Sequence, residues 1–398
     1  MKIGIYGGTF NPPHNGHITA AQAAIKQLGL DKLLLIPDKI PPHKELPAES
    51  ANERQRYEMA ALAAGSIGKL ATVSDIELKR QGKSYTSDTL RELRAIYPDD
   101  ELYLLMGSDM FLSLHTWHEP EVICSLAHLA AFSRLKEGEA EVFAAQKRTL
   151  EQKYGAKVDI IVNKNVIELS STDVRKALES GKGNDLIPIA VYGYIQREHL
   201  YGTHTDLKYL TPDELRPIAL SYLKPKRMPH VLGTEQEAVK LARMYGVDET
   251  KARIAALLHD CTKKLEMDEQ LALCKEYGIE LDELEQKALK LLHSRTGAEI
   301  ARRVFGVDEE VYNAIRWHTT GRANMTKLEK ILYLADYIEP SRDFDDVEPL
   351  RKVVYEDLDR GLLLGLQMTV EEMKAMGNPV HHNTLDAKDY LIETGVTL

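Results

Sequence analysis

The chain has 398 residues, of which 43% are hydrophobic, and its formal net charge is -10 at pH 7. This length predicts two or three domains, and the hydrophobic fraction is ample for packed cores, which excludes a disordered protein. The acidic balance argues against a general nucleic-acid binder, which normally has a basic face, but it does not prevent local basic pockets for small anions.

The cysteines and the start of the chain predict a cytoplasmic protein. Cys124, Cys261 and Cys274 form no CxxC motif and no even disulfide framework, as expected of reduced thiols. Met1 is followed directly by a strand-like run, so we expect no signal peptide. No segment approaches about eighteen consecutive apolar residues, so we expect no membrane span.

Short apolar runs alternate with amphipathic segments in the first half of the chain. The predicted strands are residues 2–6, 32–36, 102–106, 128–132 and 158–162. The predicted helices are residues 16–28, 53–64, 87–96, 139–154 and 171–178. Strands interleaved with helices predict a mostly parallel sheet covered on both faces, as in a Rossmann-like α/β domain. Ligands of such sheets bind beyond the carboxyl ends of the strands.

The motif GGTFNPPHNGH, residues 7–17, lies between the first predicted strand and the first predicted helix. Gly7 and Gly8 let the backbone turn tightly and approach a phosphate chain closely. His14 and His17 can face one ligand, and the helix N-terminus adds unpaired amides and a partial positive charge. These groups supply the positioning and charge neutralisation that nucleotidyl transfer needs. The alternative, a turn with two surface histidines, is disfavoured by the glycines and by the strand–loop–helix setting.

A second segment, SSTDVR at residues 170–175, supports this interpretation. Ser170, Ser171 and Thr172 cluster at a predicted helix start, and Arg175 follows one turn later. Hydroxyls, amides and a guanidinium at one helix end can hold a phosphate. Taken alone, the segment is more typical of an ordinary helix cap, and the first motif reverses that preference.

Together the two motifs resemble the nucleotidyltransferases, and within them the bacterial nicotinate-nucleotide adenylyltransferases. The resemblance covers most of residues 1–200 and includes Pro41-Pro42-His43-Lys44, Arg54, Ser84-Tyr85-Thr86, Asp88-Thr89-Leu90, Gly107-Ser108-Asp109, Trp117 and Arg134. It implies that His14, His17 and Arg175 are catalytic. It also implies a nucleotide-binding set of Gly7, Gly8, Thr9, Phe10, Lys44, Tyr85, Thr86, Gly107, Asp109, Trp117, Arg134, Ser170, Ser171 and Thr172.

The reaction implied by this resemblance is attack of a mononucleotide phosphate on the α-phosphorus of ATP, with loss of pyrophosphate. Trp117 would help to form the nicotinate pocket, and backbone amides around Tyr85 and Thr86 would bind the nicotinate carboxylate. Mg²⁺ would bridge the ATP phosphates. Nicotinamide mononucleotide and pantetheine phosphate are alternative acceptors, although the branch that uses pantetheine phosphate usually has Thr in place of His14. Asn11 stands where many relatives carry Asp.

From about residue 211 the apolar residues recur at helical spacing. The predicted helices are residues 235–245, 251–258, 285–292, 296–305, 309–317 and 327–338. Between the halves lies a polar, turn-rich segment, and Pro212 suits the first turn of a new helix. We place the boundary within residues 202–211 and expect domains of residues 1–203 and 204–398, the second all-helical.

Spaced histidines and aspartates in this second half suggest a metal site. His259 and Asp260 end an apolar helix, and His293 and His318 are expected at helix ends as well. Asp336 lies on an amphipathic helix, where an unpaired buried charge would be costly and a metal would resolve that cost. Each residue alone is more often structural, but the whole group in one helical domain favours metal ligands.

The order of these residues resembles the HD phosphohydrolases, in particular the YqeK branch of symmetrical diadenosine tetraphosphate hydrolases. The matching segments are residues 229–233, 257–264, 292–293, 317–322, 334–340 and 342–344. The resemblance implies one metal on His230, His259, Asp260 and Asp336, and a second on Asp260, His293 and His318, with iron as the expected pair. Asp260 and Lys263 are the implied catalytic residues. The implied phosphate or nucleotide contacts are Lys263, Thr319, Arg322, Arg342, His381 and Thr384.

The implied products are two ADP molecules from one diadenosine tetraphosphate. Two alternatives remain for the helical half: a general nucleotide phosphohydrolase and a regulatory module without catalysis. Residue types do not choose between Fe, Mn, Zn and Ni. Small-molecule partners are expected, with no nucleic acid and no membrane, and an oligomer is compatible with the sequence. Coupling between the two sites is open.

Overall fold

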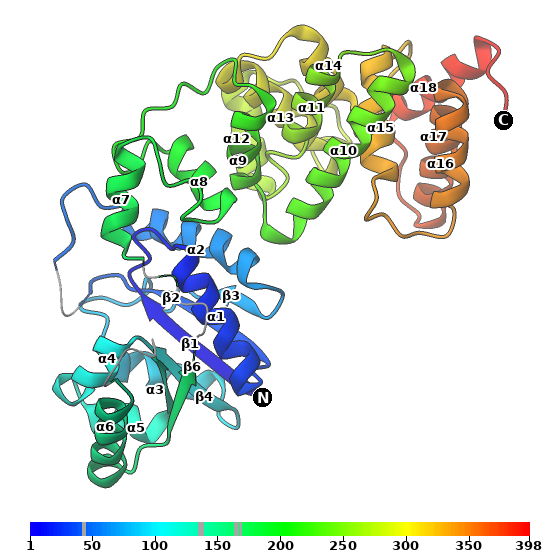
Figure 1. The fold of residues 1–398 in the computed structure, drawn as a ribbon. Coiled ribbons are helices and arrows are strands. Elements are labelled where there is room, and N and C mark those ends of the chain that lie inside the picture. Colours follow the sequence, from blue (N-terminus) through cyan, green and yellow to red (C-terminus); the bar gives the residue numbers. More distant parts are fainter. Residues whose placement is uncertain (42–44, 134–138, 163–166, 168) are drawn as a thin grey trace. The chain divides into compact units, whose positions relative to one another are not determined.

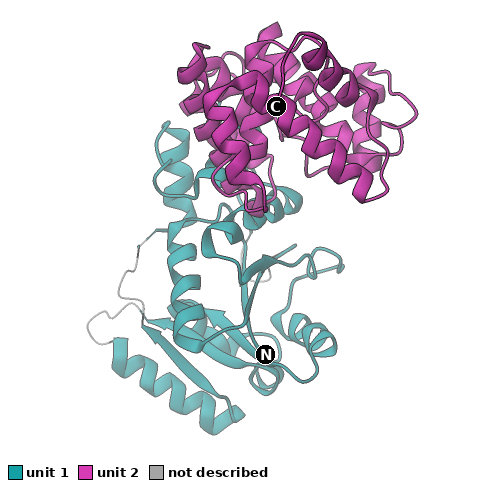
Figure 2. Ribbon diagram, turned by 90° about the vertical axis from the view of Figure 1, so that its right-hand side faces the viewer, with its two compact units in different colours: residues 1–204 teal, residues 205–398 magenta. Residues whose placement is uncertain are grey.

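A computed structural model describes residues 1–41, 45–133, 139–162, 167 and 169–398. The chain divides into two compact units, Met1–His204 and Thr205–Leu398 (Figure 2). The division lies one residue from the expected boundary, inside the polar segment that separates the two predicted halves. None of the helices among the described residues combines the length and the hydropathy that a membrane-spanning helix requires.

Unit 1 is built on a six-stranded parallel sheet with the order β3-β2-β1-β4-β5-β6 (Figure 1). The strands are β1 (Lys2–Gly8), β2 (Lys32–Pro37), β3 (Ala71–Val73), β4 (Glu101–Met106), β5 (His128–Ser133) and β6 (Val158–Val162). All the predicted strands are present, because their apolar runs are buried between two helical layers. The edge strand β3 was not predicted, since its three residues carry too little pattern to recognise.

Helices flank the sheet and confirm the α/β fold. They are α1 (Asn15–Leu28), α2 (Glu53–Ile67), α3 (Thr86–Ile96), α4 (Ser108–Ser113), the 3₁₀ turn η1 (Leu114–Thr116), α5 (Pro120–Leu126), α6 (Glu139–Tyr154), α7 (Ser171–Glu179) and α8 (Ile189–Arg197). Strand order reverses between β1 and β4, so the loops after these two strands open a crevice at the carboxyl edge of the sheet. Gly7 and Gly8 end β1 at this point, and Gly107 follows β4.

Unit 2 is helical throughout its described elements, as predicted (Figure 1). The elements are α9 (Pro212–Ser221), the 3₁₀ turn η2 (Pro225–Arg227), α10 (Met228–Tyr245), α11 (Glu249–Leu258), α12 (Met267–Tyr277), α13 (Leu289–Phe305), α14 (Glu309–Trp317), α15 (Lys327–Ile338), α16 (Val347–Glu356), α17 (Leu358–Ala375) and α18 (His382–Glu393). Pro212 lies in the first turn of α9, which Thr211 caps, as expected. Apolar faces of α10, α11, α13 and α15 contribute to a shared core.

Parts of the helix prediction for unit 2 were wrong. The separate helices expected at residues 285–292 and 296–305 are a single helix, α13, which begins only at Leu289. Asp282 accepts hydrogen bonds from the backbone N–H groups of Leu284 and Glu285. These bonds form a turn, so the residues just before Leu289 do not continue the helix toward the N-terminus. His293 therefore lies inside the first turns of α13 and not beyond the end of a helix. Helix α10 also begins earlier than expected, at Met228, so that His230 is helical.

Candidate active sites

Neighbouring cavities open at the crevice of unit 1, and several predicted nucleotide-binding residues line them. One cavity is lined by Gly7, Gly8, Asp38, Glu77, Tyr85, Thr86, Met110 and Trp117, among others. The next shares Gly7, Gly8, Asp38 and Met110 and adds Thr9, Phe10, His17, Gly107, Asp109 and Ser171. Because the two cavities share the floor formed by the glycines, two ligands bound in them would meet above the end of β1.

The two histidines of the first motif lie at the start of α1. His14 is the N-cap residue, and its backbone N–H donates to Nδ1 of His17 at 3.1 Å. Since Nδ1 of His17 accepts this bond, the neutral ring carries its proton on Nε2 and can donate it to a ligand. The rings lie 3.8 Å apart between centroids. His14 is buried, and this burial lowers its pKa to about 4, so its ring is neutral near pH 7.

Two residues that the sequence analysis missed hold the loop after β1. Asp38 follows β2 and accepts the hydroxyl of Thr9 at 2.9 Å. Arg56, which is only 1% exposed, donates to the backbone oxygens of Thr9, Asp38 and Lys39 and to the Asp38 carboxylate. An arginine on an otherwise buried helix face was the available signal, because a buried guanidinium requires several acceptors. These contacts fix the backbone that lines the cavity.

The start of α7 lies beside the first motif, as the sequence analysis expected. Ser170 caps the helix by accepting the backbone N–H of Asp173. Ser171 donates to the Pro12 carbonyl, and Arg175 donates to the Asn11 carbonyl at 2.7 Å. A second guanidinium nitrogen of Arg175 bonds Thr172 Oγ1 at 3.1 Å. The guanidinium is thus held near the loop, and the backbone amides of the helix start are directed toward the same region.

The cavity beside Trp117 ends at the N-terminus of α3. Tyr85 is the N-cap residue of this helix and Thr86 its first residue, so unpaired amides favour an anion there. Glu77, also missed from sequence, lines the cavity, accepts the hydroxyl of Thr89 at 2.7 Å, and has its pKa raised by burial. Lys44 and Arg134 lie outside the described residues.

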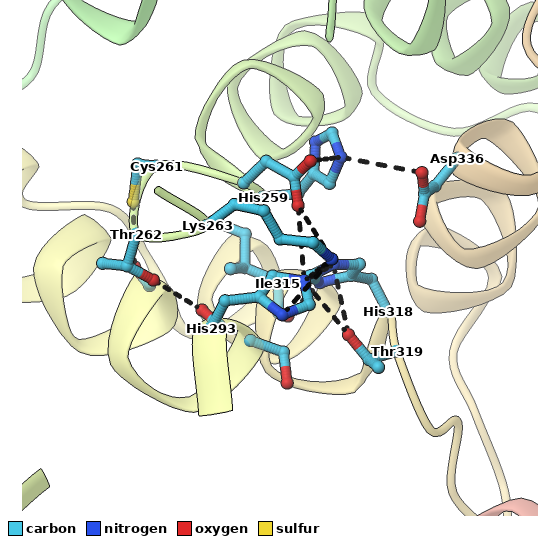
Figure 3. Close-up of polar contacts among 12 residues, drawn as sticks. His259, Cys261, Thr262, Lys263, His293, Ile315, His318, Thr319 and Asp336 are labelled. Carbon is cyan, nitrogen blue, oxygen red and sulfur yellow. Dashed lines mark hydrogen bonds and ion pairs between the residues drawn. The ribbon is translucent and has the colours of Figure 1, made fainter. Parts of the chain in front are cut away.

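In unit 2 the six predicted metal ligands converge, and Figure 3 labels four of them, His259, His293, His318 and Asp336. Groups of three ligand atoms lie within 4.8 Å of one another: His230, His259 and Asp260; His259, His318 and Asp336; and Asp260, His293 and His318. One oxygen of Asp260 lies 3.5 Å from His259 Nε2, and the other lies 3.3 Å from His293 Nε2. Asp260 can therefore bridge two centres. His259 and His318 cap the ends of α11 and α14, as predicted.

The chemistry of this cluster fits bound metal ions. Among the described residues, His230 Nε2, His259 Nε2 and Asp260 Oδ1 are buried atoms that make no hydrogen bond. They are close to one another and to other ligand atoms, because His230 Nε2 lies 2.9 Å from Asp336 and Asp260 Oδ1 lies 3.3 Å from His293 Nε2. A cation bound between them would satisfy all of these atoms. Burial lowers the pKa of His259 and holds that of His318 well below its ordinary value, so both rings are neutral. Burial opposes the charge of Asp260, yet neighbouring His259 and His293 hold its pKa well below the ordinary value. Neutral imidazoles and ionised carboxylates are what divalent transition metals bind.

Contacts behind the cluster orient its rings. Nδ1 of His259 lies 2.6 Å from the Ala256 carbonyl, and Nδ1 of His318 lies 2.7 Å from the Ile315 carbonyl, so Nε2 of each faces the centre (Figure 3). His230 Nδ1 lies 3.0 Å from Glu339, which is fully buried. A carboxylate behind a ligating histidine fixes its tautomer and raises its basicity. Glu339 was predicted only as part of a motif, although an acidic residue three positions after Asp336 was a signal.

Three cations surround the acidic ligands. Lys263 Nζ lies 2.9 Å from His293 Nε2, and Arg342 donates to Asp336 Oδ1 at 2.9 Å. Arg227, which the sequence analysis missed, donates to Asp260 Oδ2 at 2.6 Å from the end of η2. Its signal was the basic run Lys224-Pro225-Lys226-Arg227 just before His230. All three side chains are partly exposed, so they lie between the cluster and solvent.

The remaining predicted contact residues have varied surroundings. Thr319 Oγ1 lies 3.4 Å from His293 Nε2, close to the cluster. Arg322 is paired through two nitrogens with the buried carboxylate of Glu329. Both ring nitrogens of His381 lie near internal groups, the backbone N–H of Asn383 and the Asp282 carboxylate. Thr384 donates to the Thr320 carbonyl at 2.8 Å, which joins α18 to the loop after His318.

Two family models match the chain, one in each unit. A cytidylyltransferase-like model matches residues 5–177, and an HD-domain model matches residues 227–341. The first range contains the end of β1, all of α1 and the start of α7. The second contains Arg227 and all six of the clustered histidines and aspartates.

Relatives resemble either the whole chain or one of its halves. A protein from Mycoplasma genitalium named "Probable nicotinate-nucleotide adenylyltransferase/Ap4A hydrolase" is 30% identical over 377 residues, which are 92% of this chain and 97% of that protein. A "Probable nicotinate-nucleotide adenylyltransferase" from Carboxydothermus hydrogenoformans is 39% identical and covers 50% of this chain and 98% of its own length. A crystal structure of a predicted HD superfamily hydrolase involved in NAD metabolism, from Clostridium acetobutylicum, is 44% identical and covers 46% of this chain and 98% of that one, with a TM-score of 0.45.

Proposed function

The chain belongs to the family of two-domain proteins that join a nicotinate-nucleotide adenylyltransferase domain to an HD domain, and on that premise we propose two activities. Unit 1 transfers the adenylyl group of ATP to nicotinate mononucleotide, giving deamido-NAD and pyrophosphate. Unit 2 hydrolyses diadenosine tetraphosphate symmetrically to two ADP. The first activity forms a dinucleotide joined through phosphates, and the second cleaves one. Each activity is assigned to residues of one unit.

The transferase proposal rests on one observation: His17, the two glycines and Ser171 line the same cavity. In the proposed reaction a phosphate oxygen of the acceptor attacks the α-phosphorus of ATP. The bond from that phosphorus to the bridging oxygen breaks, and pyrophosphate leaves. Mg²⁺ bound with ATP supplies charge neutralisation for the phosphates. His17 donates from Nε2, and Arg175 and the amides of α7 stabilise the charge on the transferred phosphate.

Nicotinate mononucleotide is the acceptor that the cavity beside Trp117 favours. The N-terminus of α3 offers unpaired amides to a carboxylate, which the neutral amide of nicotinamide would use less well. Trp117 offers an aromatic wall for a flat ring. Pantetheine phosphate has neither a flat ring nor a carboxylate for these groups.

The hydrolase proposal rests on one observation: six His and Asp side chains of unit 2 bring their ligand atoms together in three overlapping groups, each within 4.8 Å. Two divalent metals, with iron proposed, supply an activated water and Lewis-acid stabilisation when bound to the two ligand groups defined by Asp260. Arg227, Lys263 and Arg342 contact the carboxylates of Asp260 and Asp336. Metals held by these carboxylates would leave the three cations free to bind phosphate oxygens. Thr319 lies close enough to the cluster to add a hydroxyl.

A product assay on the full chain tests both proposals. With ATP, His17→Ala should lower pyrophosphate release from nicotinate mononucleotide by about 10²-fold or more, and the exposed control His115→Ala should not. Nicotinamide mononucleotide and pantetheine phosphate, assayed in parallel, should react more slowly. Faster reaction with either one would contradict the acceptor that we propose.

For unit 2, Asp260→Ala should abolish ADP formation from diadenosine tetraphosphate and lower the bound metal. Asp268→Ala, at an exposed position in α12, is the matched control and should retain both. If Asp260→Ala hydrolyses the dinucleotide like wild type, the helical unit is not the hydrolase. If wild type binds the metals yet cleaves other nucleotides faster, a general phosphohydrolase is the better description.

A further inference from the structure

Tyr201 connects the end of unit 1 to the loop of the first motif. Its hydroxyl donates to Asn11 Oδ1 at 2.7 Å, although 190 positions separate the two residues in the sequence. Both side chains are buried, with Tyr201 6% and Asn11 3% exposed. Burial raises the pKa of Tyr201, so its hydroxyl keeps the proton that it donates.

Asn11 occupies the centre of a group of contacts around the loop. Its side-chain amide donates to Ser50 Oγ at 2.9 Å while its carbonyl oxygen accepts from Tyr201, so the amide has partners on both sides. Its backbone carbonyl accepts from Arg175, and the carbonyl of Pro12 accepts from Ser171. The position of Asn11 therefore sets the position of the side chains that begin α7.

The loop is also held in a conformation that needs support. Phe10, directly before Asn11, has a φ of 48°, in the left-handed region that is unfavourable for a bulky residue. Such a conformation persists only when neighbouring contacts determine it. Arg56 holds this loop at Thr9, and Tyr201 holds it at Asn11.

Tyr201 is itself fixed by the chain on both sides. It follows α8 with a φ of 54°, and Gly202 follows with a φ of 73°. A Cβ atom at Gly202 would lie 3.3 Å from the side chain of Glu179, the last residue of α7. The hydroxyl of Thr203 bonds the carbonyls of Ile195 and Leu200. These contacts hold the backbone around Tyr201 in place and thereby fix the position of its phenol ring beside Asn11.

We propose that Tyr201 is a positioning residue for adenylyl transfer, which acts by holding Asn11 and, through it, Arg175 and Ser171. This inference rests on the proposed transferase function. The hydroxyl is buried against Asn11 and acts through it. Its removal should therefore affect the transition state, which Arg175 stabilises, more than binding of the mononucleotide. The acceptor cavity is formed by different residues, among them Tyr85 and Trp117.

The experiment uses the full chain with saturating ATP and a varied concentration of nicotinate mononucleotide. Tyr201→Phe should lower kcat about tenfold, the usual effect of losing one buried hydrogen bond, with KM for the mononucleotide unchanged within about twofold. Tyr194→Phe is the matched control, because Tyr194 is similarly buried on α8 and does not bond the loop. The hydrolase activity of unit 2 should be unchanged in both variants.

A double-mutant cycle separates positioning from general loss of structure. If the hydroxyl acts through Asn11, Tyr201→Phe should have little further effect in the Asn11→Ala background. Additive losses, or a kcat for Tyr201→Phe equal to that of Tyr194→Phe, would overturn the inference. Should Tyr201→Phe fold poorly, Asn11→Ala alone tests the same contact and should lower kcat by a similar factor. If wild type releases no pyrophosphate from ATP and nicotinate mononucleotide, the proposed transferase function is wrong, and the role of Tyr201 is not the cause.

Discussion

At the scale of single residues, hydrogen bonds with the backbone determine the histidine tautomers in both candidate sites. Nδ1 of His17 accepts a backbone N–H, which leaves a proton on Nε2 to be donated to phosphate. Nδ1 of His259 and of His318 faces a backbone carbonyl, which leaves a lone pair on Nε2 for a metal. The same side chain is therefore prepared for opposite tasks by the group behind it.

The buried ring of His14 predicts a pH dependence of the stability of unit 1. Its pKa is lowered from 6.5 to about 4, so below pH 6.5 the unfolded chain takes up a proton that the folded ring resists. The free energy of unfolding should therefore fall as pH decreases from about 6.5 to about 4, by up to about 3 kcal/mol. Above pH 7 this contribution should be constant.

The comparison variant is His14→Asn, which removes the titrating ring and keeps a residue suited to the N-cap of α1. Urea unfolding is followed by the fluorescence of Trp117 in a Trp317→Phe background, because these are the two tryptophans of the chain. On acidification from pH 7.5 to 4, the free energy of unfolding of wild type should fall relative to that of His14→Asn. A difference that is independent of pH between 7.5 and 4 would mean that His14 is not held neutral by burial.

At the scale of elements, the metal cluster depends on how closely helices meet. A Cβ atom at Gly233 of α10 would lie 2.4 Å from Oε2 of Glu339, which follows α15. Glycine at this position lets the carboxylate reach His230 on the same helix. A glycine within a helix is normally unfavourable by up to about 1 kcal/mol, so here close approach outweighs helix propensity.

Gly233→Ala should therefore displace Glu339 and weaken metal binding by about 10- to 100-fold, although alanine favours the helix. Gly297→Ala in α13 is the matched control, because its added Cβ would have contacts of 3.5 Å or longer. Metal content and metal titration of the purified proteins measure the effect. If the two variants bind metal equally, Glu339 does not support His230 in this way.

At the scale of the whole molecule, the clustered functional residues of each proposed activity belong to one unit. His14, His17 and Arg175 lie in residues 1–204, and the six clustered ligands lie in residues 205–398. The two activities should therefore respond independently to a treatment that acts on one chemistry alone.

Removal of metal makes this separation measurable. Chelation followed by addition of Mg²⁺ should abolish hydrolysis of diadenosine tetraphosphate and leave adenylyl transfer at its original rate, because Mg²⁺ prefers oxygen ligands and the cluster is rich in imidazole. Addition of Fe²⁺ or Mn²⁺ should restore hydrolysis. Hydrolysis that survives chelation, or transferase activity that Mg²⁺ does not restore, would contradict the assignment.

Elements with long apolar patterns were predicted from the sequence, and elements with short patterns were not. The long apolar runs predicted β1, β2 and β4–β6, while β3 was too short to recognise. The break expected within α13 was wrong because the polar residues around His293 are compatible with a continuous helix, and the turn at Asp282 sets its start. For the sites, His14, His17, His259 and Asp260 were predictable because short spacing on a helix or at its end fixes where side chains point.

Local spacing and apolar periodicity predict two kinds of fold and the residue types of two candidate sites, since both patterns reflect backbone geometry. The distant groups that support those sites are found only from the packing of the elements: Arg56 behind Thr9, Glu339 behind His230, Arg227 on Asp260, and Tyr201 on Asn11. Each is a contact between residues on different elements, and its geometry depends on how those elements pack. A buried polar group needs a hydrogen-bond partner, but spacing in the sequence does not identify that partner. The partner is set by how the connected elements pack, which depends on the whole fold.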